Sequence, residues 1–408
     1  MTASFLSELE KGSKSAILKK KIISYYINNV TSPIPDLAKA LDLSVPTVTK
    51  LINEMEDVGI ITEQGKISNR GGRRPSIYGL NPASGYFFGM DVRRNHVNMG
   101  LMNFSGEMID EYMDVPLSDF GITNRRESID EIARLANEFI DDSSVDREHI
   151  LNGCIDMSGR VNPRTGYSYS TFSFSETPIA EIFSHKLGFP AVIDNDTRAM
   201  TYGEYLKGCG NGEKNLLFIN ISWGLGMGII INGSVYEGES GYAGELGHVA
   251  TFDNEIMCHC GKKGCLETEV SGMALQRRVV ESLREGKNSI LSESFERDGE
   301  NAITLPSIID AVRQEDLLCI DLLEDIGGQL GKWIASMMNI FNPQTVVIGG
   351  TLSETNDYLL QPIKLAVNKY TLRLVSQGSK ILCSRLGDRA GVIGACLLAR
   401  NRLLVEND

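Results

Sequence analysis

Hydrophobic positions in the first 60 residues recur at helical spacing in three segments. Residues 14–28 repeat them at Ile17, Leu18, Ile22, Ile23 and Tyr26, and a shorter helix is expected from about residue 35 to 41. The third segment, 44–57, has the inward stripe Val48, Leu51, Ile52 and Met55; Ser44 is placed to cap its start, and Gly59 to end it. The segment NNVTSP at 28–33, between the first two helices, is expected to be a break in the helical pattern. Two short strands around a Gly- and Arg-rich tip follow, and the whole predicts a winged helix-turn-helix that closes near residue 80.

From residue 85 onward the pattern changes to strands. Three successive strands are expected over 86–92, 96–107 and 108–116, then a helix near 125–141 and further strands at 150–157 and 191–195. A second strand-rich block covers 215–238, a buried strand follows at 345–349, and residues 390–404 suggest an amphipathic C-terminal helix. Two three-stranded openings, each followed by alternating helices and strands, predict a duplicated α/β architecture.

Composition limits where nucleic acid can bind. The 408 residues carry a formal net charge of −13, but residues 1–80 hold 11 Lys and Arg against 8 Asp and Glu. The remainder holds 29 basic against 45 acidic residues, so DNA contacts are expected only in the first domain. No run of about 20 apolar residues is present, and the N-terminus lacks the apolar core of a signal peptide. We therefore expect a cytoplasmic protein with no membrane partner.

The third helix and the tip of the wing supply the candidate DNA contacts. In a helix-turn-helix, side chains near the start of the second helix reach base edges in the major groove, while arginines in a wing meet phosphates or the minor groove. The expected contacts are Ser44, Thr47, Thr49, Lys50, Arg70, Arg73 and Arg74. The alternative is a small helical domain that mediates protein contacts through solvated charges.

Residues 245–267 have the spacing of a metal site. His248, Cys258, Cys260 and Cys265 make one imidazole and three thiolates, a complete tetrahedral set for Zn²⁺ with no position left for water. Such a closed site is structural, so one zinc per chain is expected to pin this loop. His259 can compete as a ligand, although neighbouring side chains on an extended segment point apart. The alternative is a group of buried free cysteines near a chance histidine.

Several segments together resemble the ROK family of repressors, open reading frames and sugar kinases, and specifically its DNA-binding regulators. They are GYAGELGHVATF at 241–252, CHCGKKGCLE at 258–267, DND at 194–196, FNPQTVVIGG at 341–350 and GVIGACLLA at 391–399. The resemblance implies an α/β body with a two-lobed actin/hexokinase-like (ribonuclease H-like) fold behind the winged helix. The expected domains are 1–80 for the winged helix, 83–196 plus 386–408 for the first lobe, and 197–385 for the second lobe with the zinc loop and dimer contacts.

The resemblance also implies a sugar site. Asn195 and Asp196 match sugar-contacting positions, and Asp196 stands where kinases of the family place the catalytic base. The other implied contacts are Glu245, Glu267, His248 through its second nitrogen, and the turn Ser158–Gly159. Carboxylates and amides suit this task because they bind adjacent hydroxyl groups and reject analogues that leave a buried group unpaired.

Two departures from the family pattern suggest that phosphoryl transfer has been lost. Kinases of this fold carry an Asp-x-Gly-Gly-Thr turn, where this chain has Asp91-Val92-Arg93-Arg94-Asn95. A second turn, normally Thr-Gly-Thr-Gly, contains Trp223 here. Bulky side chains in both turns leave no bare backbone to approach ATP phosphates.

The sequence thus predicts a sugar-responsive DNA-binding regulator, a repressor of carbohydrate-utilisation genes with no catalytic activity. Its expected partners are operator DNA, a monosaccharide or sugar phosphate effector, and further copies of itself in a homodimer or homotetramer. An active sugar kinase with an appended DNA-binding domain is the alternative. A metal sensor built on the cysteine site is a third possibility, disfavoured because a buried structural site holds zinc too tightly to report its level.

Overall fold

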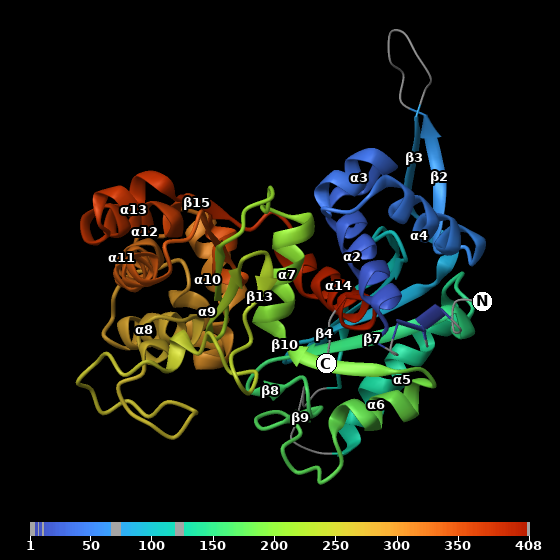
Figure 1. The fold of residues 1–408 in the computed structure, drawn as a ribbon. Helices are drawn as coiled ribbons and strands as arrows, with labels where there is room; N and C mark the ends of the chain where they lie inside the picture. The colour runs from blue at the N-terminus through green and yellow to red at the C-terminus, as the bar shows by residue number, and fades with distance from the viewer. Residues whose placement is uncertain (1–4, 7, 10–11, 67–74, 119–125, 406–408) are drawn as a thin grey trace. The chain divides into compact units, whose positions relative to one another are not determined.

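The computed structural model describes residues 5–6, 8–9, 12–66, 75–118 and 126–405 (Figure 1). The chain divides into two compact units, one made of Met1–Ala199 with Gly391–Asp408 and the other of Met200–Ala390. No helix within the described ranges is both long and apolar enough to cross a membrane.

The N-terminal part of the first unit is three helices and a small sheet, here called the head. The helices are α2 (Lys14–Asn29), α3 (Ile34–Ala40) and α4 (Val45–Asp57), close to the ranges expected from the hydrophobic spacing. The sheet has the order β1 (Thr31–Pro33), β3 (Ser76–Leu80), β2 (Ile61–Lys66), with antiparallel pairing throughout. The expected break at 28–33 does separate the first two helices, but three of its residues form the strand β1 against β3, which was not anticipated. The apolar stripe of α4 is buried, as predicted.

The rest of the first unit contains a five-stranded sheet of order β10-β7-β4-β5-β6. Its strands are β4 (Tyr86–Val92), β5 (His96–Asn103), β6 (Met108–Pro116), β7 (Ile150–Met157) and β10 (Ala191–Asn195), and a separate small hairpin is formed by β8 (Val161–Asn162) and β9 (Tyr167–Ser168). Helices α5 (Arg126–Asp142) and α6 (Ile179–Leu187) bury their apolar side chains with those of one face of the large sheet. Phe88 and Met90 lie on that face, so Gly89 between them faces the other way.

The second unit repeats this arrangement. Its sheet has the order β13-β12-β11-β14-β15, built from β11 (Leu216–Ile221), β12 (Leu225–Ile231), β13 (Ser234–Val235), β14 (Thr345–Gly349) and β15 (Lys380–Cys383). In both sheets the first two strands of the block pair antiparallel and the later strands pair parallel. The predicted duplicated α/β architecture is therefore confirmed. The helices are α7 (Asp196–Lys207), which starts in the first unit, α8 (Gly272–Arg284), α9 (Ser292–Asp298), α10 (Leu305–Arg313), α11 (Leu317–Phe341), α12 (Asp357–Tyr370) and α13 (Arg373–Gly378).

The C-terminal helix α14 (Ala390–Leu404) differs from its prediction. It is not amphipathic, because residues 390–400 are all buried. Glycines on both sides of the contact let α14 approach its neighbours closely. A Cβ added at Gly394 of α14 would lie 1.7 Å from the carbonyl oxygen of Ala199, and one added at Gly89 of β4 would lie 2.5 Å from the sulfur of Cys396. Helix α14 therefore covers the sheet face opposite α5 and α6, and lies within the core of the first unit.

Candidate functional site

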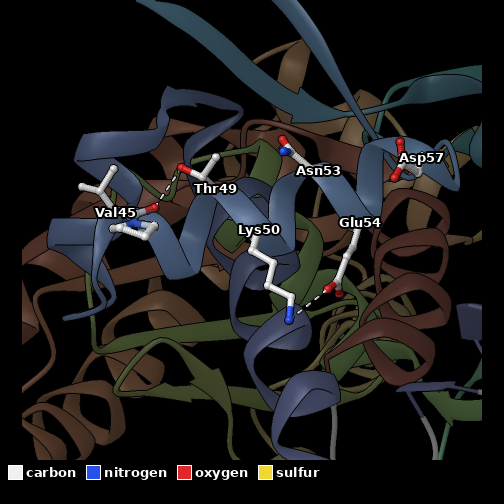
Figure 2. Close-up of a pocket in the computed structure, with 7 residues that line it drawn as sticks. Val45, Thr49, Lys50, Asn53, Glu54 and Asp57 are labelled. Atoms are coloured by element: carbon white, nitrogen blue, oxygen red, sulfur yellow. Dashed lines mark hydrogen bonds and ion pairs between the residues drawn. The ribbon is translucent and has the colours of Figure 1, made fainter.

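The exposed face of α4 carries the predicted DNA contacts (Figure 2). Of the predicted contacts, Figure 2 labels Thr49 and Lys50. Ser44 caps the helix by accepting a hydrogen bond from the backbone N–H of Thr47, and the two hydroxyl groups lie 2.7 Å apart. The Thr49 hydroxyl donates to the carbonyl of Val45, 2.8 Å away. The Lys50 side chain is 78% exposed, with its Nζ 3.9 Å from Glu54. The predicted residues Arg70, Arg73 and Arg74 of the wing lie outside the described residues.

A buried lysine behind α4 was not anticipated from the sequence. The Lys19 ammonium lies 2.8 Å from a carboxylate oxygen of Glu8 and 3.0 Å from one of Glu54. Burial opposes its charge, but the hydrogen bonds and opposite charges of the two carboxylates prevail and raise the pKa of Lys19. This contact ties α2 to α4 and compensates the charge of Glu54. The sequence pattern did not indicate this ion pair, because the partners of Lys19 lie in other segments of the chain.

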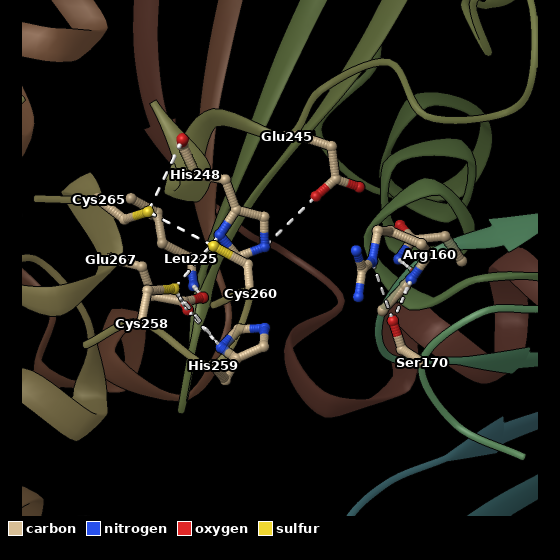
Figure 3. A network of polar contacts seen from close by, with 12 residues as sticks. Arg160, Ser170, Leu225, Glu245, His248, Cys258, His259, Cys260, Cys265 and Glu267 are labelled. Atoms are coloured by element: carbon tan, nitrogen blue, oxygen red, sulfur yellow. Dashed lines mark hydrogen bonds and ion pairs between the residues drawn. The ribbon is translucent and has the colours of Figure 1, made fainter. Parts of the chain in front are cut away.

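The four predicted metal ligands come together in the second unit (Figure 3). The ligand atoms of His248, Cys258, Cys260 and Cys265 all lie within 4.8 Å of one another. His248 Nδ1 is 3.6 Å from the Cys258 sulfur, and the sulfurs of Cys260 and Cys265 are also 3.6 Å apart. A tetrahedral zinc with ordinary bond lengths separates its ligand atoms by about 3.5–3.8 Å. The cluster can therefore bind a metal ion of this size.

Turns in the backbone form this cluster. Gly261 and Gly264 both have positive φ, and a Cβ at Gly264 would lie 2.1 Å from the carbonyl oxygen of Phe252. A short bridge pairs Met257 with Lys263, which brings the cysteines before and after the turn together. Burial raises the pKa of the Cys258 thiol to about 12, so its thiolate form requires a compensating positive charge. A bound cation supplies such a charge.

His259 does not point away as expected. Its Nδ1 is 2.9 Å from the buried carboxylate of Glu267 and 3.9 Å from the Cys258 sulfur. The expectation assumed an extended segment, whereas residues 258–262 form a tight turn in which successive side chains need not point apart. His248, His259 and Glu267 form a second group with metal-ligand spacing, and it overlaps the first at His248.

The predicted sugar contacts of the first unit lie side by side. The Asn195 amide donates to the carbonyl of Gly159, 3.1 Å away, and to the carboxylate of Asp196, 2.9 Å away. Gly159 has φ +95°, and a Cβ there would lie 2.5 Å from the Cβ of Ser170, so this tight turn requires glycine. Burial raises the pKa of Asp196; the neighbouring Asp91 charge adds to the rise, against a backbone hydrogen bond from Thr197.

The predicted sugar contacts of the second unit flank the cysteine cluster. Glu245 precedes the short helix η3 (Leu246–His248), and its carboxylate lies 3.6 Å from Nε2 of His248. His248 thus turns one ring nitrogen to the cysteines and the other to Glu245. Glu267 is 4% exposed and accepts a hydrogen bond from the backbone N–H of Leu225. Burial opposes its charge, yet the hydrogen bonds from His259 and Leu225 hold the pKa of Glu267 below its usual value.

The two turns that depart from the kinase pattern occupy equivalent places, each between the first two strands of its sheet. In the first, the Arg93 side chain folds back so that its Nε donates to Asp91 over 2.8 Å. In the second, Trp223 is 40% exposed at the tip between β11 and β12. Each turn therefore carries a large side chain where a phosphate-binding turn would present bare backbone.

Comparison with known proteins places this arrangement in a family. The model described as "ROK family" matches residues 88–402, which is more than half of the chain. The chain belongs to the ROK family. A second model, "Winged helix-turn-helix DNA-binding", matches residues 16–62. The predicted fold class, a winged helix followed by an actin/hexokinase-like α/β body, is confirmed.

Relatives of this ROK protein include both regulators and kinases. It is 29% identical over 395 residues to the "Putative xylose repressor" of Caldicellulosiruptor sp. (strain Rt8B.4), covering 96% of this chain and 97% of the relative. It is also 29% identical to the "Glucokinase" of Halalkalibacterium halodurans, but over 78% of this chain and 96% of the relative. Among solved structures, a ROK family transcriptional regulator described as a homologue of the E. coli Mlc protein superposes with a TM-score of 0.80. It is 25% identical and covers 96% of each chain.

Proposed function

We propose that this ROK protein is a sugar-responsive transcriptional repressor of carbohydrate-utilisation genes. The observation that carries the proposal is the joining of a winged helix to a ROK body in one chain, an arrangement shared along almost the full length of the xylose repressor relative. In this proposal the head (1–80) binds operator DNA. The sugar binds to the body, whose lobes are 83–196 plus 386–408 and 197–385. The sugar changes DNA affinity only if it binds the two functional states with different affinity.

The proposed DNA contacts are Ser44, Thr47, Thr49, Lys50, Arg70, Arg73 and Arg74. The exposed Lys50 is free to leave its 3.9 Å contact with Glu54 for a guanine or a phosphate, which supports its assignment. Ser44 acts through the helix cap, since its hydroxyl already binds Thr47. The hydroxyl hydrogen of Thr49 is used within the helix, so its methyl group and remaining lone pair face the DNA.

The proposed metal is one structural Zn²⁺ per chain, held by His248, Cys258, Cys260 and Cys265. Four closely spaced nitrogen and sulfur ligands support zinc and leave no position for a water molecule. The metal neutralises the thiolates and pins the loop. Because Glu245 and Glu267 lie at the two ends of this loop, the metal site fixes both carboxylates for the sugar.

The proposed sugar contacts are Ser158, Gly159, Asn195 and Asp196 of the first unit, and Glu245, His248 and Glu267 of the second. The mutual contacts of Asn195, Asp196 and Gly159 support the first set. With Nδ1 committed to the metal, Nε2 of His248 has a fixed tautomer for a sugar hydroxyl. The effector is a monosaccharide or a sugar phosphate.

We propose no kinase activity, although the glucokinase relative keeps an active kinase with an appended head as the second candidate. Phosphoryl transfer depends on positioning the phosphates and stabilising their charge. Of the two turns that would bind the phosphates, one contains Arg93 and the other contains Trp223. The test is a coupled assay with ATP and a panel of hexoses, pentoses and amino sugars, alongside sugar-dependent operator release. Turnover of about 1–100 per second would establish the kinase instead. The absence of specific DNA binding would refute the repressor.

We also propose a cytoplasmic homodimer or homotetramer. Exposed apolar side chains in and beside α11, α12 and α13 of the second unit support self-association: Ile340, Leu365, Leu372 and Leu374 are 67–86% exposed. A winged helix offers few contacts by itself, so two heads on paired half-sites increase both affinity and specificity. Light scattering that gives a 44.8 kDa particle in both free and DNA-bound forms would contradict this proposal.

A further inference from the structure

Asn53 lies at the centre of the exposed face of α4. Figure 2 shows its amide on the helix surface, between Thr49 and Asp57. These residues help to line a shallow groove of about 650 Å³ along α4, together with Val45, Pro46, Lys50 and Glu54. At 3.6 residues per turn, Asn53 points within about 20° of Pro46, two turns further along the same face.

The polar side chains of this face that precede or adjoin Asn53 already have partners. Ser44 and Thr47 bind each other in the helix cap, and Thr49 donates to the backbone. Glu54 is held by the buried ammonium of Lys19, 3.0 Å away. Within the described part of the chain, by contrast, Asn53 is exposed and its amide makes no hydrogen bond to another residue. An asparagine amide offers a donor and an acceptor together, which matches N7 and the N6 amino group of adenine in the major groove.

The negative charge of Asp57 limits the length of α4 that can approach DNA. Asp57 lies one turn beyond Asn53 on the same face, and a carboxylate there disfavours a close approach to phosphates. The usable face therefore runs from the start of the helix at Val45 to Asn53, a distance of about 12 Å. This length corresponds to about three or four base pairs.

We infer that Asn53 determines the specificity of operator recognition by reading one adenine in each half-site through a paired hydrogen bond to N6 and N7. The inference rests on the proposed DNA-binding function of the head. It assigns Asn53 to direct base contact and leaves phosphate contacts to the cationic side chains.

The test is a base-preference profile of the full-length protein, obtained by selection from randomised duplexes and then by binding to single-base variants. The natural protein is expected to require adenine at one position of each half-site. Asn53→Ala is expected to lose that preference, with a penalty of about 5- to 150-fold on the adenine sequence and little on the others. The slope of log Kd against log salt should not change, because an amide releases no counterion. Asn28→Ala is the matched control, since Asn28 is an exposed asparagine on α2 whose amide binds the backbone of its own helix.

A second measurement changes the DNA and not only the protein. Replacing the selected adenine by 7-deazaadenine removes the N7 acceptor, which should weaken binding by the natural protein but leave binding by Asn53→Ala unaffected. An unchanged base profile in Asn53→Ala would overturn the inference, as would an even loss across all sequences with a shallower salt slope. If the natural protein itself shows no sequence preference, it is the proposed DNA-binding function that fails.

Discussion

A buried carboxyl group in the first unit makes stability depend on pH in an unusual direction. Asp156 lies in β7, in register with Asp91 of β4 on one side and Asp194 of β10 on the other. Asp194 is compensated by Arg198, and Asp91 accepts hydrogen bonds from Arg93 and Asn98. Both carboxylate oxygens of Asp156 are buried with no hydrogen-bond partner among the described residues. Burial raises the pKa of Asp156 well above its usual value, and the Asp91 charge adds to the rise.

The perturbation is Asp156→Asn, which replaces the carboxyl group by a neutral amide of the same shape. The amide can donate to the unpaired oxygen of Asp91, as a protonated Asp156 would. Because the folded state favours the protonated acid, the natural protein keeps the full contribution of Asp156 below the ordinary carboxyl pKa of about 4. It loses that contribution as pH rises toward the raised value. In this window the natural protein should lose about 1.4 kcal/mol per pH unit relative to the variant.

Calorimetric melting from pH 4.5 to 8.5, without sugar, measures this difference. For a unit of about 200 residues, 1.4 kcal/mol corresponds to a difference of roughly 3–6 °C in Tm per pH unit. Asp156→Asn should therefore melt higher than the natural protein at pH 8 and about equally near pH 4.5. The matched control is Asp142→Asn, at an exposed position of α5, which should follow the natural protein at every pH. A Tm difference that stays constant with pH, or a variant that is less stable at pH 8, would refute the reasoning.

Three further predictions test the metal, the sugar and the core. Cys260→Ser should release the zinc and raise the sugar Kd, whereas Cys383→Ser, at a cysteine outside the cluster, should do neither. Metal analysis that finds no zinc in the natural protein would exclude the site. Asp196→Asn should reduce sugar-dependent thermal stabilisation but retain sugar-free operator binding; an unchanged sugar response would remove Asp196 from the ligand site. Gly394→Ala should destabilise the first unit by at least about 1–3 kcal/mol in urea unfolding, because its Cβ would overlap the backbone of Ala199, while Gly378→Ala, with open space around it, should have little effect.

Local patterns in the sequence determined the elements of this protein. The apolar stripe from Val48 to Met55 predicted helix α4, and the Ser44 cap predicted where it starts. Both signals depend only on residues within a few positions of one another. The spacing of His248 and the three cysteines likewise predicted their meeting, since a short loop with two glycines allows few other arrangements. The duplicated order of strands was also predictable, because each strand corresponds to a local run of apolar residues.

Contacts between distant segments were decided only by the tertiary structure. The break at 28–33 contains a short strand because β3, more than 40 residues later, supplies its hydrogen bonds. The pairing of Lys19 with Glu54, and the alignment of Asp156 with Asp91, depend on helix packing and on strand register. Residues 390–400 of α14 are all buried, and Gly394 allows the backbone of Ala199 to approach this part of the helix. Periodicity along a chain specifies which side of an element is apolar. The partner that covers this side, and the charges brought beside it, are set by packing between segments that lie far apart in the sequence.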